Sequence, residues 1–280
     1  MNISKLSLLL FISFIACMNT NNKNAQADDI KTAGKKETDK TVAFNTLIKG
    51  TGSPTIIFES GLGTPLNNWE SIQTSISKNY KTIAYDRRGI GQSPSTDNPR
   101  TIENLVKDLD ILISQNKIDG PIILVGHSLG GHIVRKYQES FPTKVAGLFL
   151  IDPTNEYVYE EVFKQMSPES ADSMKTAWDN SYKKQPIGVY NEWKEVYNID
   201  KIMRNNPLPK DIPITILVSY QENSFNTKKN IQIRKKLSSD WKKNKPNVKI
   251  LNTTKSGHYI HLGEPEWVIN ELEAYLKNLN

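Results

Sequence analysis

A serine lies at the centre of a glycine-rich hexapeptide whose spacing suits nucleophilic chemistry. The segment Gly126-His127-Ser128-Leu129-Gly130-Gly131 has the pattern G-x-S-x-G, between an apolar run at 122–125 and an amphipathic stretch that ends before Pro142. A chain that turns sharply from strand to helix raises the serine Oγ above the sheet, and the flanking glycines let neighbouring backbone approach. The sequence therefore predicts Ser128 as a nucleophile. The alternative is an ordinary serine in a glycine turn.

A serine nucleophile needs a base, and the chain has four histidines from which to supply one. His258 stands in Ser256-Gly257-His258, after a β-type run at 248–251 and before a helical pattern that starts near Pro265. A loop in that position returns to the sheet edge that carries the serine. We predict that His258 accepts the proton of Ser128, and His261, three residues later, is the weaker candidate.

A third group must orient the imidazole and stabilise its protonated form, and two acids qualify. Asp152 ends an apolar run at 145–151 and precedes Pro153, which stiffens the chain there. Glu222 follows the next strand-like run, 214–218, in a looser polar segment. Both give the order serine, acid, histidine. We favour Asp152, with Glu222 as the alternative acid and with a turn or helix-cap role as the alternative reading of Asp152.

Acyl transfer also needs hydrogen-bond donors where negative charge develops on the substrate. One predicted donor is the backbone N–H of Leu129, directly after the nucleophile. The other is the N–H of Leu62 in Glu59-Ser60-Gly61-Leu62-Gly63, which follows a short β-type run at 55–58. A plain glycine turn is the alternative for that segment.

Alternating β-type and helical patterns must position these residues. Residues 42–48 and 55–58 read as a hairpin around the turn-rich segment 49–54, and further β-type runs lie at 82–85, 122–125, 145–151, 214–218 and 248–251. Helical spacing marks 102–113, 133–141 and the segment from Pro265 to Leu279. Strands alternating with helices predict a largely parallel sheet with helices on both faces.

One segment interrupts this alternation. Residues 154–210 contain no clear strand and are rich in tyrosine, tryptophan and charged residues. We expect a helical insertion that forms a lid over the carboxyl edge of the sheet. Its aromatic side chains either line a substrate pocket or only hold the insertion's helices together.

Five segments in order give the chain a resemblance to a known family: ESGLG at 59–63, DRRGIGQS at 86–93, GHSLGG at 126–131, IDP at 151–153 and SGHYIHLGEPE at 256–266. Together they resemble the α/β-hydrolase superfamily over nearly all of 41–280. The resemblance implies an α/β fold with a mostly parallel eight-stranded sheet, helices on both faces and a helical lid. A serine at position 128 is unlike the aspartate nucleophile of the haloalkane dehalogenases and epoxide hydrolases in this superfamily.

These residues predict a serine hydrolase that cleaves a carboxylic ester or a related small acyl substrate through an acyl-enzyme. Such chemistry needs no metal and no organic cofactor, and no metal-ligand spacing is present. A peptidase, thioesterase, lactonase or carbon–carbon hydrolase on the same scaffold is an alternative. A non-catalytic binding protein on that scaffold is another.

The amino-terminal 40 residues predict export and anchoring. Residues 1–16 have a short basic start and an apolar core too short to span a bilayer, as in a signal peptide. Cys17, the single cysteine, follows Phe14-Ile15-Ala16 in a pattern that resembles a bacterial lipobox, and 17–40 read as a flexible tether ahead of the domain at 41–280. We expect a lipoprotein anchored to a membrane of the bacterial cell envelope, with a secreted soluble protein as the alternative.

The net charge of +6 arises largely from lysines between 228 and 245. No nucleic-acid motif accompanies them, so we interpret the cluster as the solvated face of a helix and expect no nucleic-acid partner.

Overall fold

The structure is a computed structural model that describes residues 42–279. The predicted signal peptide (1–16) and the tether with its lipidation site Cys17 (17–40) lie outside the described residues. The described residues from Ala43 onward belong to one compact unit. Within 42–279, no helix combines the length and the apolar character needed to cross a membrane.

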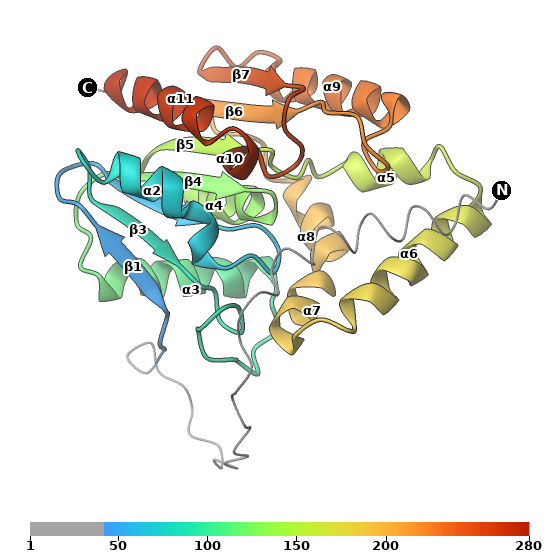
Figure 1. Cartoon of the computed structure of the whole chain (residues 1–280), viewed down its shortest axis with the longest axis horizontal. Coiled ribbons are helices and arrows are strands. Elements are labelled where there is room, and N and C mark those ends of the chain that lie inside the picture. Colours follow the sequence, from blue (N-terminus) through green and yellow to red (C-terminus); the bar gives the residue numbers. More distant parts are fainter. Residues whose placement is uncertain (1–41, 280) are drawn as a thin grey trace. The chain divides into compact units, whose positions relative to one another are not determined.

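A seven-stranded sheet forms the centre of this unit (Figure 1). Its strands in chain order are β1 (Thr46–Lys49), β2 (Thr55–Glu59), β3 (Thr82–Tyr85), β4 (Ile122–His127), β5 (Val145–Ile151), β6 (Ile214–Ser219) and β7 (Val248–Thr253). They are arranged β1-β3-β2-β4-β5-β6-β7, and only β1 runs antiparallel to its neighbour. Parallel neighbours require crossover connections, which place helices on the two faces.

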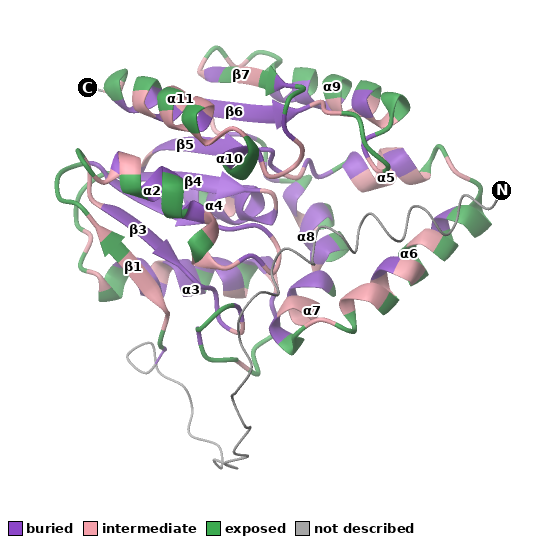
Figure 2. Cartoon of the chain, viewed as in Figure 1, coloured by how far each residue is buried: buried purple, intermediate pink, exposed green. Residues whose placement is uncertain are grey.

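The helices that cover the sheet divide into two sets. Helices α2 (Glu70–Ile76) and α11 (Pro265–Lys277), with the short η1 (Leu66–Trp69) and α10 (Ile260–Gly263), share one hydrophobic cluster with the strands. Helices α3 (Ile102–Gln115), α4 (Leu129–Ser140) and α9 (Lys228–Lys242) contribute to the cluster on the other face. The burial view shows the strands enclosed between these two sets, with exposed residues on the outer sides of the helices (Figure 2).

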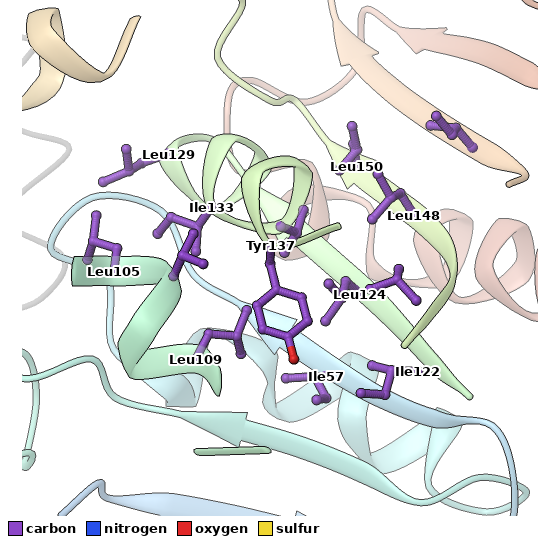
Figure 3. Close-up of a cluster of buried hydrophobic side chains, with 14 of the residues drawn as sticks. Ile57, Leu105, Leu109, Ile122, Leu124, Leu129, Ile133, Tyr137, Leu148 and Leu150 are labelled. Atoms are coloured by element: carbon purple, nitrogen blue, oxygen red, sulfur yellow. The ribbon is translucent and has the colours of Figure 1, made fainter. Parts of the chain in front are cut away.

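Side-chain alternation along the strands accounts for the two clusters. The central parallel strands are apolar on both faces because both faces are covered. On the α3–α4 face the cluster contains Ile57, Leu124, Leu148, Leu150, Ile133 and Tyr137 (Figure 3). Their immediate neighbours along the strands, such as Phe58, Val125 and Phe149, belong to the cluster on the α2–α11 face. This core fixes the position of β4 and α4, and therefore of the turn that carries Ser128.

Two expectations about the sheet are wrong or unconfirmed. The predicted hairpin between 42–48 and 55–58 does not form, because β1 pairs with β3, whereas β2 lies between β3 and β4 and is parallel to both. All five residues of β2 are buried, which fits a central strand better than half of a hairpin. The predicted eight strands are not confirmed, since the sheet of the described residues has seven.

Between β5 and β6 the chain is helical, as expected for 154–210. This insertion consists of α5 (Val158–Phe163), α6 (Pro168–Tyr182), α7 (Ile187–Trp193) and α8 (Val196–Met203). Its aromatic side chains contact one another: Tyr182 stacks on Trp193 with ring centroids 4.2 Å apart, and Trp178 lies 6.1 Å from Trp193. Leu62 and Phe225, from outside the insertion, pack against this aromatic cluster.

Candidate active site

The carboxyl ends of the parallel strands bring the predicted site residues to one edge of the sheet. Ser128 directly follows β4, Asp152 follows β5, and His258 lies in the loop after β7. Leu62 lies in the loop after β2. In an open α/β sheet this edge is where ligands bind.

Ser128 has a strained backbone, with φ +53° and ψ −119° between β4 and α4. A non-glycine residue with positive φ persists only where its surroundings hold it. Here the Ser128 N–H donates to the Ile151 carbonyl at 3.2 Å, and the Ser128 carbonyl accepts from the N–H groups of Gly131 and Thr154 at 2.9 and 3.2 Å. The turn is therefore fastened to its own helix and to the end of the neighbouring strand.

A glycine is required where this turn meets the loop after β2. A Cβ on Gly130 would lie 2.3 Å from the Glu59 carbonyl oxygen and 2.8 Å from that of Ser60. These carbonyl oxygens could move aside only if the backbone of residues 59–60 shifted. Only glycine therefore allows α4 to begin this close to residues 59–60. The second glycine of the G-x-S-x-G pattern thus brings the loop carrying Leu62 against the turn carrying Ser128.

His258 and Asp152 form a direct pair. His258 Nδ1 lies 2.7 Å from Asp152 Oδ2, and Asp152 is almost fully buried whereas the His258 side chain is 40% exposed. Because a carboxylate oxygen only accepts, Nδ1 carries the proton and donates it to this hydrogen bond. In the neutral ring, Nε2 is then left with a lone pair.

Asp152 has two further partners, both on its other oxygen. Oδ1 accepts from the Ser219 N–H at 2.8 Å and from Arg234 Nη2 at 2.5 Å. Burial by itself would raise the pKa of Asp152, but the positive charge of Arg234 and the hydrogen bonds from His258 and the Ser219 N–H outweigh it. The pKa of Asp152 therefore lies below its ordinary value, and the carboxylate is ionised at neutral pH.

Glu222, the alternative acid, is exposed and takes no part in this pair. The geometry within the described residues thus joins His258 to Asp152, the acid that the sequence favoured.

The neighbour of Ser128 links the nucleophile turn to the histidine loop. His127 Nε2 lies 3.0 Å from the backbone carbonyl oxygen of His258, so Nε2 donates, and the two rings are 4.7 Å apart. A Cβ on Gly61 would lie 2.8 Å from His127 Nδ1 and 3.3 Å from the Ser128 Cβ. The turn with Ser128, the loop with Leu62 and the loop with His258 therefore meet around His127.

Within residues 42–279, the two predicted oxyanion donors have no hydrogen-bond acceptor. Among the described residues, neither the Leu62 N–H nor the Leu129 N–H donates a hydrogen bond. Leu129 is the first residue of α4, where a helix leaves its N–H groups unpaired. Both groups could therefore donate to a bound oxygen.

Comparison with known proteins agrees with this architecture. The family model described as alpha/beta hydrolase fold matches residues 54–174. The esterase EaEST from Exiguobacterium antarcticum superimposes with a TM-score of 0.63 at 18% identity, over 85% of this chain and 97% of that chain. The chain has the α/β-hydrolase fold.

Sequence relatives match only part of their own length. The uncharacterized protein YqjL of Bacillus subtilis is 32% identical over 105 residues, which is 38% of this chain and 42% of YqjL. The mitochondrial palmitoyl-protein thioesterase ABHD10 of Homo sapiens is 28% identical over 172 residues, 59% of this chain and 56% of that protein. The chain thus spans less than two thirds of the length of these curated relatives.

Two charged side chains near the hydrolase-fold site were missed by the sequence analysis. Arg234 reaches Asp152 from α9, and Glu192 reaches the Gly63 N–H from α7. Arg234 lies within the basic segment 228–245, which the sequence analysis interprets as a solvated helix face, and Glu192 has no motif around it. The position of Glu192 beside Trp193, in a segment rich in aromatic residues, was the one available sign that the Glu192 carboxylate is buried.

Across the described residues, no group of three or more histidine, cysteine, aspartate or glutamate side chains is arranged to hold a metal ion.

The remaining histidines are buried. His132 Nε2 lies 3.0 Å from Asp200 Oδ1. His261, the weaker candidate for the base, stacks on Trp69 with centroids 4.6 Å apart and lies the same distance from the His127 ring. Burial, reinforced by the charge of His258, lowers the pKa of His261 to about 3. Burial, followed by the charges of His261 and His258, lowers the pKa of His127 well below its ordinary value.

This histidine cluster predicts a loss of stability in acid. Between pH 6.5 and about 3, His261 is protonated in the unfolded chain and neutral in the folded one, so the unfolded state binds more protons and stability falls as pH falls. Replacing His261 by Phe keeps a ring on Trp69 and removes this titration. Between pH 5.5 and 4, we expect the unfolding free energy to fall with pH in both proteins. The slope for the variant should be smaller than the wild-type slope by about 1.4 kcal/mol per pH unit.

Urea unfolding at a series of pH values measures these slopes. Leu262→Ala, at an exposed neighbouring position, is the control and should keep the wild-type slope. Equal slopes for wild type and His261→Phe would mean that the folded protein protonates His261 at its ordinary pKa.

Proposed function

We propose that the protein is a serine hydrolase that cleaves a carboxylic ester or a related acyl substrate through an acyl-enzyme. The observation that carries this proposal is the 2.7 Å pair between His258 Nδ1 and Asp152 Oδ2, at the sheet edge where Ser128 is held with positive φ. The pair leaves Nε2 of His258 as the free basic nitrogen. Along the chain the three residues follow the order serine, acid, histidine, which is the order found in α/β-hydrolases.

In the proposed first step, the Ser128 Oγ attacks the carbonyl carbon of the substrate while His258 Nε2 accepts its proton. Asp152 stabilises the imidazolium that forms, because its carboxylate is buried, ionised and hydrogen bonded to Nδ1. The N–H groups of Leu62 and Leu129 stabilise the tetrahedral oxyanion. His258 then returns the proton to the leaving group as the intermediate collapses to the acyl-enzyme.

In the second step, His258 removes a proton from water, and the hydroxide attacks the acyl-enzyme. The same two N–H groups hold the second oxyanion, and collapse releases the carboxylic acid and regenerates the Ser128 hydroxyl. Every proton passes through Nε2, which is why the fixed tautomer of His258 matters in both steps.

We further propose that the insertion α5–α8 serves as a lid and contacts an apolar part of the substrate. Leu62, whose N–H is the proposed donor, packs with its side chain against the aromatic cluster around Trp178 and Trp193. An acyl or alcohol group bound beside the oxyanion donors would therefore meet aromatic carbon. Because ABHD10, which is similar to this chain, is a palmitoyl-protein thioesterase, thioesters are the second class of substrate to assay.

Removing the nucleophile or the base should abolish activity. We expect Ser128→Ala and His258→Ala to lower kcat toward p-nitrophenyl esters by about 10³-fold or more, because neither step can proceed without them. A fluorophosphonate probe should label the wild type and leave Ser128→Ala unlabelled, with circular dichroism as the check on folding. If the wild type is not labelled either, the protein is a binding protein on this scaffold.

The two candidate acids provide a matched pair of variants. Asp152→Asn keeps the shape of the side chain but removes its charge and favours the wrong histidine tautomer, so we expect kcat to fall about 10³-fold. Glu222→Gln makes the same chemical change at an exposed position and should leave kcat near the wild-type value. The reverse result in steady-state assays would assign the acid to Glu222.

For the amino terminus we propose, from the sequence alone, a signal peptide and a lipid anchor on Cys17 in the bacterial cell envelope. Cys17→Ser removes the thiol that would be acylated. The variant should move from the membrane fraction to the soluble fraction, as measured by fractionation and immunoblotting. Unchanged fractionation would leave the secreted soluble form as the better description.

A further inference from the structure

Arg87, in the loop after β3, is a buried cation whose hydrogen bonds converge on the loop that carries Leu62. Its side chain is 2% exposed. Nη1 donates to Glu59 Oε1 at 2.7 Å and to the Ser60 carbonyl at 2.6 Å, and Nη2 donates to the Gly61 carbonyl at 2.7 Å. One guanidinium thus holds three successive residues, and it binds the backbone at two of them.

The bond to the Gly61 carbonyl bears directly on the proposed oxyanion donor. The carbonyl of Gly61 and the N–H of Leu62 belong to one planar peptide unit, in which they point in opposite directions. Fixing the oxygen on Arg87 therefore fixes the direction of the Leu62 N–H. The Thr64 N–H donates to the same oxygen at 3.1 Å, so this peptide unit is held by two donors.

Glu192 completes the arrangement from the helical insertion. Its two oxygens accept from Nε and Nη2 of Arg87 at 2.7 and 2.8 Å, in the bidentate geometry that suits a guanidinium. Oε2 also accepts from the Gly63 N–H at 2.9 Å, and the Glu192 side chain is fully buried. The peptide units on both sides of the Leu62 Cα are therefore held by this one ion pair.

We propose that Arg87 and Glu192 are positioning residues for the oxyanion hole, through which docking of α7 sets the direction of the Leu62 N–H. The inference rests on the proposed serine hydrolase function and extends it. Arg87 also places a positive charge on the carbonyl side of the Gly61–Leu62 peptide, which polarises its N–H toward an anion. The alternative is an ion pair that only fastens the insertion to the sheet domain.

The ion pair is flanked by a second carboxylate, which limits the choice of variants. Glu59 is fully buried and accepts from the Tyr85 hydroxyl as well as from Arg87. Removing the cation would leave two carboxylates buried without a countercharge, which is strongly destabilising. Arg87→Lys keeps the charge but cannot reproduce the fork that reaches two carboxylates and two carbonyls.

The chain offers a matched control in Arg135. Its guanidinium is equally buried, pairs with Glu156 at 2.9 Å and donates to the Asn206 carbonyl at 2.6 Å, with no bond to residues 59–63. Arg135→Lys therefore makes the same chemical change to a buried arginine that binds a carboxylate and a carbonyl, but at a place away from residues 59–63.

The test compares both lysine variants by three measurements on the full-length protein. For Arg87→Lys we expect the rate constant for fluorophosphonate labelling and the kcat for p-nitrophenyl acetate each to fall about 10²-fold, the size of effect that follows loss of an oxyanion donor. KM should change little. The Ki of an aryl trifluoromethyl ketone, which forms an oxyanion on addition of Ser128, should rise by a similar factor.

Arg135→Lys should lose thermal stability to a similar degree while all three measurements stay near the wild-type values. If Arg87→Lys is likewise less stable but keeps its kcat, labelling rate and Ki, the pair only fastens the insertion and the inference is wrong. Should Arg87→Lys not fold, Glu192→Gln replaces it, with the same expected split between kcat and KM. Failure of the wild type to label would instead overturn the proposed function itself.

Discussion

The buried carboxylate of Asp152 is the constraint on which the proposed site depends. An ionised carboxylate can be removed from water only if its oxygens are hydrogen bonded and its charge is balanced. Asp152 meets this requirement with His258 on one oxygen and with Arg234 and the Ser219 N–H on the other. These partners come from the loop after β7, from α9 and from β6, so satisfying one carboxylate draws three separate segments to the end of β5.

Backbone strain at the same edge has a related origin. Ser128 and Asp152 both have positive φ, at +53° and +40°. Each follows a central strand directly, where the chain must leave the sheet at once, and each is tied to the adjacent strand: the Ser128 N–H to Ile151 and the Asp152 N–H to Leu217. The buried parallel sheet therefore supplies the hydrogen bonds that hold two unfavourable conformations, and both residues lie at its carboxyl edge.

The sequence was sufficient for features that depend on local pattern. Local sequence patterns predict the G-x-S-x-G turn, the strand and helix beside it, and the helical insertion. Pro153, directly after Asp152, favoured Asp152 over Glu222. The position of β2 was not predictable in this way. The glycine and proline residues at 50–54 suggest a hairpin. The five residues of β2 are buried because β2 lies between β3 and β4, and local sequence does not show this pairing. Arg234 and Glu192 were missed because their ion pairs are with residues 82 and 105 positions away in the chain.

Arg234 and Glu192 show that the helices, as well as the sheet, position the groups of the proposed site. The sheet places the backbone, and charges from α9 and α7 orient the groups that the proposed chemistry uses. For Glu192 this has a consequence for how the insertion can move. Among the described residues, withdrawing α7 would leave Glu59 as the only carboxylate paired with Arg87. Separating the buried ion pair of Arg87 and Glu192 would cost several kcal/mol. Helix α6 buries only Ala171 and Trp178 along its 15 residues. In the proposed lid, opening therefore costs less at α6 than at α7, which is held to the loop that carries Leu62 by the ion pair with Arg87.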